Sequence, residues 1–465
     1  MPAPYVLFGA AVAFWSLAVV IYNLYLHPLK DIPGPFFAKV SRWWLFTLEM
    51  RGNPHSEILA LHGNYGPIMR ISPNEVSIAD LEASSVIYGQ NSKFEKSHYF
   101  YRPFEDQASN LFTIRDRQQH SQDKRLISHA FSRANIIQHK ACIYNHAVYL
   151  MDEIARRAEN DETITLFNAF RCMTLDTISE FAFGKSAHAL KSEDFHSVIF
   201  DGIDNATHSV PFVRAPPSPD VLRNSLTQQV STFPCPTGDS QVVKLLWDQF
   251  HKKSQTLSEE HLISEAIVMI VAGTDTMAVA LSTTLHSLLQ MPDVYQELQD
   301  EVRTVMPFQD SQPAFEELDA LPLLDACLKE GLRISCPSRV RLPRTVPAEG
   351  WTFKGHRFPP GTIVSLSPLY FLHDERVFPS PMKYDPSRWL VDSDRKKEMM
   401  SNFHPFSRGT RQCIGQSLSL IEQKIVLSLF VTRFNPREVL KREIVIEEAI
   451  TTIIKDALDV RVHLA

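Results

Sequence analysis

The feature that most constrains this chain is an uncharged run of 22 residues near its N-terminus, from Tyr5 to Leu26. At about 1.5 Å per residue, a helix of this length spans the hydrocarbon core of a bilayer, about 30 Å thick. A secretory signal peptide would show a basic n-region, a shorter apolar stretch and small residues at a cleavage site, and none of these is present. We therefore expect a membrane-spanning helix and not a buried core helix, which is usually shorter and amphipathic.

The charges around this run predict its orientation. Lys30, Lys39 and Arg42 follow it, and no charged side chain precedes it. The positive-inside rule then leaves the rest of the chain in the cytoplasm. Prolines flanking Gly34 form a stiff, non-helical spacer after the run. We expect three parts: an anchor over 1–27, a Pro-rich hinge over 28–36 and a single domain over 37–465.

Composition excludes several classes of protein. Charged residues make up 22% of the chain and apolar residues 44%, as in an ordinary globular protein, so disorder and fibrous structure are excluded. The net charge is −6 and no basic block stands out, so we expect no nucleic-acid partner. Neither a dinucleotide fingerprint nor a phosphate loop is present. The six cysteines include no C-x-x-C pair, which favours reduced thiols over disulfides or a zinc ribbon.

A second long apolar stretch runs from Ala266 to Gln290. A helix that is apolar on all sides is either a membrane span or the central helix of a large protein. Asp275 lies in its middle, and an acid there costs about 2.5–3.5 kcal/mol in lipid, which favours the central helix. Gly273 and the threonines beside it weaken regular helix, so we predict a polar break that is suited to chemistry.

The remaining pattern is mostly helical. Apolar residues recur at helical spacing over 293–306 and 321–334, and a basic helix is expected over 117–131. Strand-like segments broken by turn residues occupy 340–367, and a proline-rich loop follows over 373–390. The chain therefore predicts a mainly α body with a minor β region, and not alternating βαβ units.

The most specific motif begins at Phe406 and reads FSRGTRQCIG. It resembles F-x-x-G-x-R-x-C-x-G, the haem-binding loop of the cytochrome P450 family. Cys413 would be the axial ligand of the haem iron, and the helix expected after it would favour the thiolate through its dipole. Arg411 can pair with a haem propionate. Gly409 and Gly415 would let the backbone approach the porphyrin and adopt positive φ.

The resemblance covers nearly the whole chain and gives weaker motifs a meaning. Glu330 to Arg333 is similar to the family's E-x-x-R, and 384–389 resembles its F-x-P-E-R-W. In the family these motifs form a buried ion triad, so Glu330, Arg333 and Arg388 are expected to hold the haem loop. His120 and Lys124 stand where the family often has W-x-x-x-R, and Arg344 stands where a propionate is often contacted. The residues expected to bind haem are Cys413, Arg411, Phe406, Gly409, Gly415, His120, Lys124 and Arg344.

The resemblance also implies a monooxygenase that carries haem b. Thr276 would hold oxygen and an ordered water, and Asp275 would relay protons from solvent. The 465 residues leave no room for a flavin domain, so electrons would come from NADPH through a membrane-bound NADPH–haemoprotein reductase. Cytochrome b5 is a further candidate partner. The candidate docking charges are Arg408, Lys424, Lys124 and Arg125.

Together these observations predict a cytochrome P450 fold that follows one transmembrane helix. We expect the protein to cross the endoplasmic reticulum membrane once, with its catalytic domain facing the cytoplasm. The N-terminal region and Met173 to Ser186 resemble filamentous-fungal members. We therefore expect insertion of one oxygen atom of O₂ into a small apolar terpenoid, polyketide or alkaloid intermediate of secondary metabolite biosynthesis. The alternatives are a haem-thiolate isomerase or dehydratase, and a non-catalytic haem-binding protein. The stretch from Asp204 to Gln249 is shorter than we expect for two lid helices.

Overall fold

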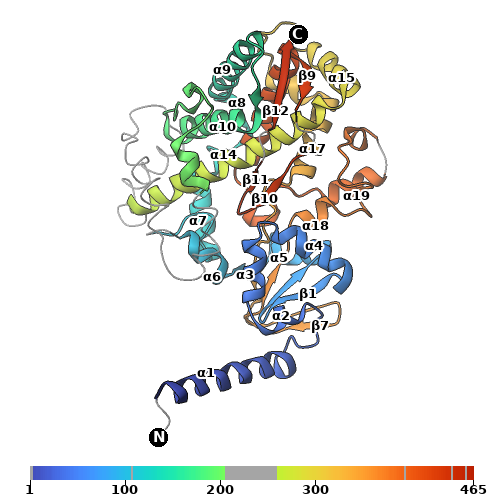
Figure 1. The fold of residues 1–465 in the computed structure, drawn as a ribbon. Coiled ribbons are helices and arrows are strands. Elements are labelled where there is room, and N and C mark those ends of the chain that lie inside the picture. Colours follow the sequence, from blue (N-terminus) through green and yellow to red (C-terminus); the bar gives the residue numbers. More distant parts are fainter. Residues whose placement is uncertain (1–3, 106–107, 205–258, 392–393, 441–442, 456–457) are drawn as a thin grey trace.

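The fold is mainly helical with small sheets, as predicted (Figure 1). This computed structural model describes residues 4–105, 108–204, 259–391, 394–440, 443–455 and 458–465. The predicted lid stretch, from the residue after Asp204 to Gln249, lies outside the described residues. The helices of the N-terminal part are α1 (Pro4–Ile21), η1 (Tyr22–Leu26), α2 (Phe36–Val40), α3 (Trp43–Met50), α4 (Pro54–Tyr65), α5 (Leu81–Tyr88), α6 (His98–Tyr101), η2 (Arg102–Phe104), α7 (Arg117–Ser128), α8 (Arg133–Gln138), α9 (Lys140–Glu159), α10 (Leu166–Phe183) and η3 (Ala189–Lys191).

The C-terminal part carries the longest helix and most of the strands (Figure 1). The predicted helices over 117–131, 293–306 and 321–334 correspond to α7, α15 and α17. The C-terminal helices are α14 (Glu259–Leu289), α15 (Pro292–Arg303), α16 (Phe315–Asp319), α17 (Pro322–Ser335), α18 (Leu369–Leu372), η4 (Pro386–Trp389), α19 (Asp394–Asn402), η5 (Gly409–Arg411) and α20 (Gln416–Arg433).

Helix α14 forms the centre of the body, where it packs against α10 and α17 (Figure 1). Its span from Glu260 to Leu289 has a mean hydropathy of 1.6 and is 72% buried, so the predicted central helix is confirmed. The predicted polar break is wrong, because the helix continues through this stretch. The hydroxyls of Thr274 and Thr276 donate to the carbonyls of Ile270 and Ala272 inside the helix, so they are satisfied without interrupting it.

The described strands form small sheets beside the helices. In the described residues one sheet has the order β1-β2-β8-β5-β3, with β2 and β8 parallel and the other pairs antiparallel. This sheet lies beside α2 to α5, at the end of the body nearest to α1 (Figure 1). The other sheets have the orders β4-β12-β9, β6-β7 and β10-β11. The strands are β1 (Ile68–Ser72), β2 (Glu75–Ile78), β3 (Glu95–Lys96), β4 (Ile164–Thr165), β5 (Arg344–Thr345), β6 (Trp351–Phe353), β7 (His356–Phe358), β8 (Ile363–Ser365), β9 (Phe434–Val439), β10 (Ile446–Glu448), β11 (Thr452–Ile454) and β12 (Asp459–Leu464).

The N-terminal helix projects away from the body (Figure 1). Within the span from Tyr5 to Leu26, an 18-residue stretch has a mean hydropathy of 2.1 and no buried residue. Contacts with the body begin at Asn23, whose side-chain amide donates to the carbonyl of Val40 at 3.2 Å. In the predicted hinge, Leu29 and Ile32 are buried in the core beside the first sheet. These two hinge residues are therefore packed against the body, while Phe36 at the end of the hinge is exposed.

An aromatic surface follows the hinge. Phe36, Phe37 and Trp43 at the start of α2 and α3 are 59%, 69% and 67% exposed. Large aromatic side chains seldom gather on a surface that faces only water, and they are common at the interface of a membrane with water. We call these three residues the aromatic surface.

Candidate functional site

The loop before α20 exposes the thiol of Cys413 on one side, and we call the space on this open side the recess. The backbone N–H of Cys413 donates to the carbonyl of Phe406 at 3.0 Å, which closes the loop. The thiol is accessible to solvent, yet burial raises its pKa, so the sulfur is surrounded by protein while one side stays open. Backbone N–H groups of Gly415 and Gln416 bond to the sulfur, and Lys124 attracts it, which lowers the pKa in the opposite direction. These donors favour a thiolate.

The two glycines of the loop differ in backbone conformation and in the contacts that a side chain would make. Gly409 has φ +73°, and a Cβ there would lie 2.0 Å from the carbonyl oxygen of Tyr88 at the end of α5. Glycine is required at this position by the turn and by this close approach. Gly415 has φ −77°, so its predicted positive φ is wrong, and its nearest neighbour would be Cys413 Sγ at 3.8 Å. The residue instead stands directly before α20.

Basic side chains gather beside this recess. The predicted residues His120 and Arg344 are buried, and Lys124 and Arg411 are half-buried. The structure adds Lys96 of β3, which is 6% exposed and donates to the carbonyls of Leu111 and Phe112. We call these five side chains the cation cluster. Sequence reasoning missed Lys96 because a lone lysine on a two-residue strand carries no motif.

The cation cluster is bonded to neutral acceptors. Arg411 donates to the carbonyls of residues 114–116, before α7, and Lys124 donates to the carbonyls of Thr410 and Gln412 at 3.0 Å each. Arg344 donates to the Tyr101 hydroxyl at 2.7 Å. Among the described residues, no carboxylate lies within 4.0 Å of any member of the cluster.

Mutual repulsion in the cation cluster appears in its pKa values. Burial and then Arg411 and the other members lower the pKa of His120 to about 3. Burial, with Arg344 next, lowers the pKa of Arg411 to about 10. Burial and the neighbouring arginines hold the pKa of Lys96 well below its usual value. Buried cations without an anionic partner are costly, so this arrangement fits a bound polyanion. The two propionates of haem have this charge, and Cys413 faces the adjoining recess.

On α14, the two predicted catalytic residues face different surroundings. Thr276 is partly exposed and lies one turn after Ala272, which is exposed, so this face of the helix is open. Asp275 is fully buried, and its Oδ1 accepts from Arg171 Nε at 2.7 Å. Arg171 on α10 also pairs with Asp204 at 2.6 Å. Sequence reasoning missed this arginine, because it lies 104 residues from Asp275.

The carboxyl of Asp275 binds Arg171 through one oxygen and has the Thr451 hydroxyl nearby. Its Oδ2 has no hydrogen-bond partner among the described residues. Burial raises the pKa of Asp275, while Arg171 and Thr451 work in the opposite direction. A buried acid with a raised pKa and a free oxygen is able to bind and release a proton. In this conformation it is sealed from solvent, in contrast to the direct solvent relay that the sequence suggested.

The three residues of the expected ion triad lie together. Arg333 donates to both oxygens of Glu330, at 2.9 and 2.8 Å, and Arg388 Nε donates to Glu330 Oε1 at 2.9 Å. The Trp389 indole adds a donor at 2.9 Å, which sequence reasoning did not assign. Glu330 and Arg333 are fully buried. This network joins α17 to η4, ahead of the Cys413 loop.

One of the predicted docking charges is not available. Lys424 is 4% exposed and forms ion pairs with Asp319 at 2.8 Å and Asp325 at 3.1 Å, so its assignment to a docking surface is wrong. Its position in the middle of α20 explains the error, because that helix is buried along most of its length. Arg125 is exposed, and Arg408 bonds to the Ser85 hydroxyl at 3.0 Å.

Comparisons with known proteins agree with this geometry. The family profile described as Cytochrome P450 matches residues 33–228 and 220–455. The chain is 31% identical over 458 residues to cytochrome P450 monooxygenase poxM of Penicillium oxalicum, covering 92% of this chain and 89% of the relative. It is 30% identical to fusicoccadiene C-8 hydroxylase of Alternaria brassicicola, covering 91% and 87% of the two chains.

Further relatives and a solved structure extend the comparison. Cytochrome P450 monooxygenase TRI4 of Trichoderma arundinaceum is 29% identical over 464 residues, covering 92% of this chain and 89% of the relative. The fold is similar to the crystal structure of the heme domain of a cytochrome P450DA mutant, with a TM-score of 0.75 at 17% identity, covering 89% of this chain and 93% of that one. This last likeness bears on the fold alone.

Proposed function

This chain belongs to the cytochrome P450 family, and from that premise we propose that it hydroxylates a small apolar intermediate of fungal secondary metabolism, with Cys413 as the axial haem ligand. It is a cytochrome P450 monooxygenase that binds haem b and uses NADPH-derived electrons through a reductase. The observation that carries the residue assignment is the accessible Cys413 thiol beside the cation cluster. When bound, a haem with a thiolate ligand supplies the activation of O₂ for insertion into a C–H bond.

The residues around the recess have separate tasks. Cys413 would bind the iron, and the N–H groups of Gly415 and Gln416 would stabilise its negative charge. The cation cluster would hold the propionates, with Arg344 and Arg411 the strongest candidates because guanidinium groups pair with carboxylates as forks. Lys124 would also hold the Cys413 loop in place, because its ammonium group donates to two backbone carbonyls of that loop.

Thr276 and Asp275 would control oxygen and protons. Thr276 lies on the open face of α14, where its hydroxyl would orient oxygen and an ordered water. Asp275 would carry a proton on Oδ2, the oxygen that Arg171 leaves free. Because Arg171 also binds Asp204, it would position Asp275 and limit how far this carboxyl can turn.

The name of one relative supports an apolar hydrocarbon as substrate class. The name of the Alternaria brassicicola relative states hydroxylation at C-8 of fusicoccadiene, an apolar diene. A substrate of this kind partitions into lipid, which agrees with an anchor over 5–26 and with entry from the membrane. A polyketide or alkaloid intermediate has the same demand for an apolar pocket. We place α1 in the endoplasmic reticulum membrane with the body on the cytoplasmic side, because Lys30, Lys39 and Arg42 follow the helix.

The first experiment tests the axial ligand. The reduced protein with carbon monoxide should show the red-shifted Soret band of thiolate ligation, and Cys413→Ala should abolish haem incorporation. Cys327→Ala, which removes a buried thiol on α17, is the matched control and should keep the band. A Cys413→Ala protein with an unchanged band would disprove the assignment.

Two other uses of the same haem remain as alternatives. An isomerase or dehydratase would convert its substrate without a reductase, and a haem-binding sensor would form no product. Product formation that requires NADPH, O₂ and an NADPH–haemoprotein reductase separates the monooxygenase from both. Comparing metabolites of a strain carrying the gene with those of a deletion strain would identify the substrate. Adding cytochrome b5 to the assay would show whether it is a second electron donor.

A further inference from the structure

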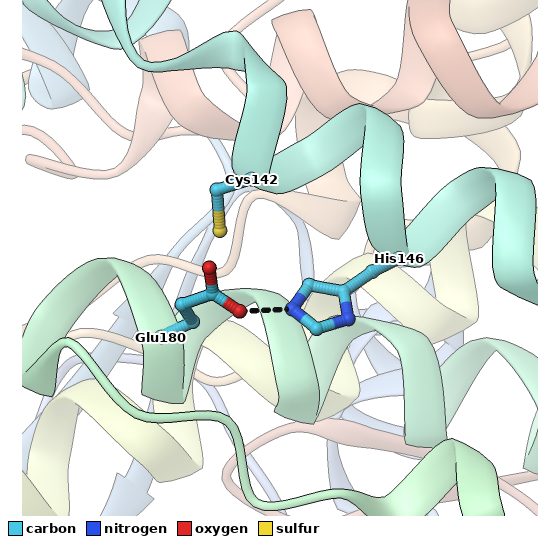
Figure 2. Close-up of side chains that lie close together, drawn as sticks. All are labelled: Cys142, His146 and Glu180. Atoms are coloured by element: carbon cyan, nitrogen blue, oxygen red, sulfur yellow. Dashed lines mark hydrogen bonds and ion pairs between the residues drawn. The ribbon is translucent and has the colours of Figure 1, made fainter.

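A second cluster of chemically reactive side chains lies on the outer helices, apart from the haem recess (Figure 2). Cys142 and His146 come from α9, and Glu180 comes from the end of α10. The thiol, the imidazole and the carboxylate point toward one another, and their ligand atoms all lie within 4.8 Å of one another. His146 Nε2 and Glu180 Oε2 are 2.8 Å apart.

The helices fix this arrangement by their geometry. Cys142 and His146 are four residues apart, so they lie on one face of α9. Glu180 stands opposite them because α9 packs against α10. Figure 2 shows the sulfur next to one oxygen of the Glu180 carboxylate and the imidazole next to the other. The cluster therefore joins two helices through three side chains, each with one good metal-ligand atom.

The ligand set and its dimensions suit zinc. Zinc prefers sulfur, nitrogen and oxygen ligands in a tetrahedron, at about 2.0–2.3 Å, which places neighbouring ligand atoms about 3.3–3.6 Å apart. One separation in the cluster is 2.8 Å and none exceeds 4.8 Å, so small side-chain rotations would bring the three ligand atoms to the spacing of a zinc site. Magnesium and calcium demand oxygen ligands and suit it poorly.

The cluster has one carboxylate and is open to solvent. Glu180 supplies this carboxylate, beside the thiol of Cys142 and the imidazole of His146. The side chains of His146 and Glu180 are 14% and 38% exposed, so an ion and a water can reach the cluster.

We propose that Cys142, His146 and Glu180 bind one zinc ion, with water as the fourth ligand, and so tie α9 to α10. Binding would release the thiol proton and replace the hydrogen bond between His146 and Glu180 by two bonds to the metal. No electrons are transferred. Because α9 also packs against α20, whose first residue is Gln416, the ion would brace the helices behind the Cys413 loop.

Zinc binding is measured on the full-length, haem-loaded protein in detergent, purified without a polyhistidine tag. Competition with a chromogenic chelator should give one zinc per chain, with no competition from magnesium at a hundredfold excess. X-ray absorption at the zinc edge, which is separate from iron, should show one sulfur at about 2.3 Å. Cys142→Ser should remove this sulfur and weaken zinc binding at least tenfold. Haem content, followed by its absorbance, reports that each variant is folded.

Matched variants complete the test. Glu180→Gln and His146→Gln should each weaken binding at least tenfold, and they keep the proposal testable if Cys142→Ser folds poorly. His196→Gln removes a histidine from another histidine–carboxylate pair, with Asp201 at 3.2 Å and no thiol, and should bind zinc as the wild type does. Cys172→Ala removes a thiol from α10 and should also have no effect. A wild type that takes up no zinc, or zinc without sulfur in its shell, overturns the proposal. Since monooxygenase activity is not the readout, this result is independent of the proposed function.

Discussion

At the scale of single residues, the site is built from polar groups whose partners lie far away in the chain. Cys413, Glu330 and Arg333 were predictable because their spacing matches a family pattern. Arg171 and Lys96 were not, because nothing in their neighbourhood in the sequence marks them. Arg171 depends on the packing of α10 against α14, and Lys96 on a two-residue strand. Contacts of this kind are decided by the whole fold and not by local pattern.

Thr276→Ala tests oxygen handling at one residue. The substitution removes the hydroxyl on the open face of α14 but leaves the Cys413 loop untouched. Substrate binding should change little, because the interaction matters only after oxygen has entered. The ratio of product to NADPH should fall by at least threefold, with a matching rise in hydrogen peroxide. Thr276→Ser keeps the hydroxyl and should couple nearly as well as the wild type. Equal coupling in the alanine variant would remove Thr276 from the mechanism.

Glu422→Gln tests a buried acid. Burial raises the pKa of Glu422 from 4.5 to about 8, so the folded protein holds a proton that the unfolded chain has released. The stability this proton gives is complete below pH 4.5 and is lost as the pH rises to 8. Relative to the glutamine variant, the wild type should lose about 1.4 kcal/mol of unfolding free energy per pH unit between pH 5.5 and 7.5. Urea unfolding with a metal chelator present measures this, and parallel pH profiles would refute the raised pKa.

At the scale of elements, the positions of the helices were easier to predict than whether a helix runs without interruption. The spacing of apolar residues predicted α7, α15 and α17, and the composition of 266–290 predicted a buried helix. The polar break failed because a threonine hydroxyl can bond to a carbonyl of its own helix, and Gly273 serves close packing. A Cβ at Gly273 would lie 2.7 Å from the Ile178 side chain. Sequence alone cannot separate a glycine that bends a helix from one that lets a neighbour approach.

Gly331→Ala tests the close approach of α14 to a glycine of α17. A Cβ at this position in α17 would lie 1.8 Å from Thr284 Oγ1 and 2.9 Å from Thr284 Cβ, so α17 and α14 would have to separate. We expect a loss of about 1–3 kcal/mol of stability, since overpacking forces such shifts. Gly63→Ala in α4 is the matched control, because nothing lies within 4 Å of a Cβ there. It should be neutral or stabilise by up to about 1 kcal/mol. Denaturant unfolding compares the two, and equal effects would contradict the packing argument.

At the scale of the whole molecule, a folded body follows an apolar N-terminal helix that is a candidate membrane span. Deleting residues 1–26 should release the protein from membranes only in part and leave the haem spectrum intact. The remaining attachment would come from the aromatic surface, whose three side chains are exposed on the body. Replacing Phe36, Phe37 and Trp43 by serine in the shortened protein should complete the release, as measured by flotation with vesicles.

The controls for this prediction are internal. The same serine replacements in the full-length chain should leave it bound to membrane, because α1 alone is long enough to span the bilayer. Loss of haem on removal of 1–26 would mean that this segment belongs to the core. If the shortened protein with all three serine replacements stays on vesicles, other residues bind the lipid.

The cation cluster has a consequence for how the protein is made. His120 is neutral at cellular pH because its pKa is lowered to about 3, but two arginines and two lysines of the cluster converge where the described chain provides no carboxylate within 4.0 Å. The newly folded polypeptide therefore has unbalanced positive charge in its interior. Until an anion balances it, the repulsion favours opening of this region, and opened chains are the ones that cellular proteases degrade. The amount of enzyme in the cell would then follow the supply of newly synthesised haem more closely than the amount of messenger RNA. Starving the cells of the haem precursor should shorten the lifetime of the protein before any change in its transcript is seen.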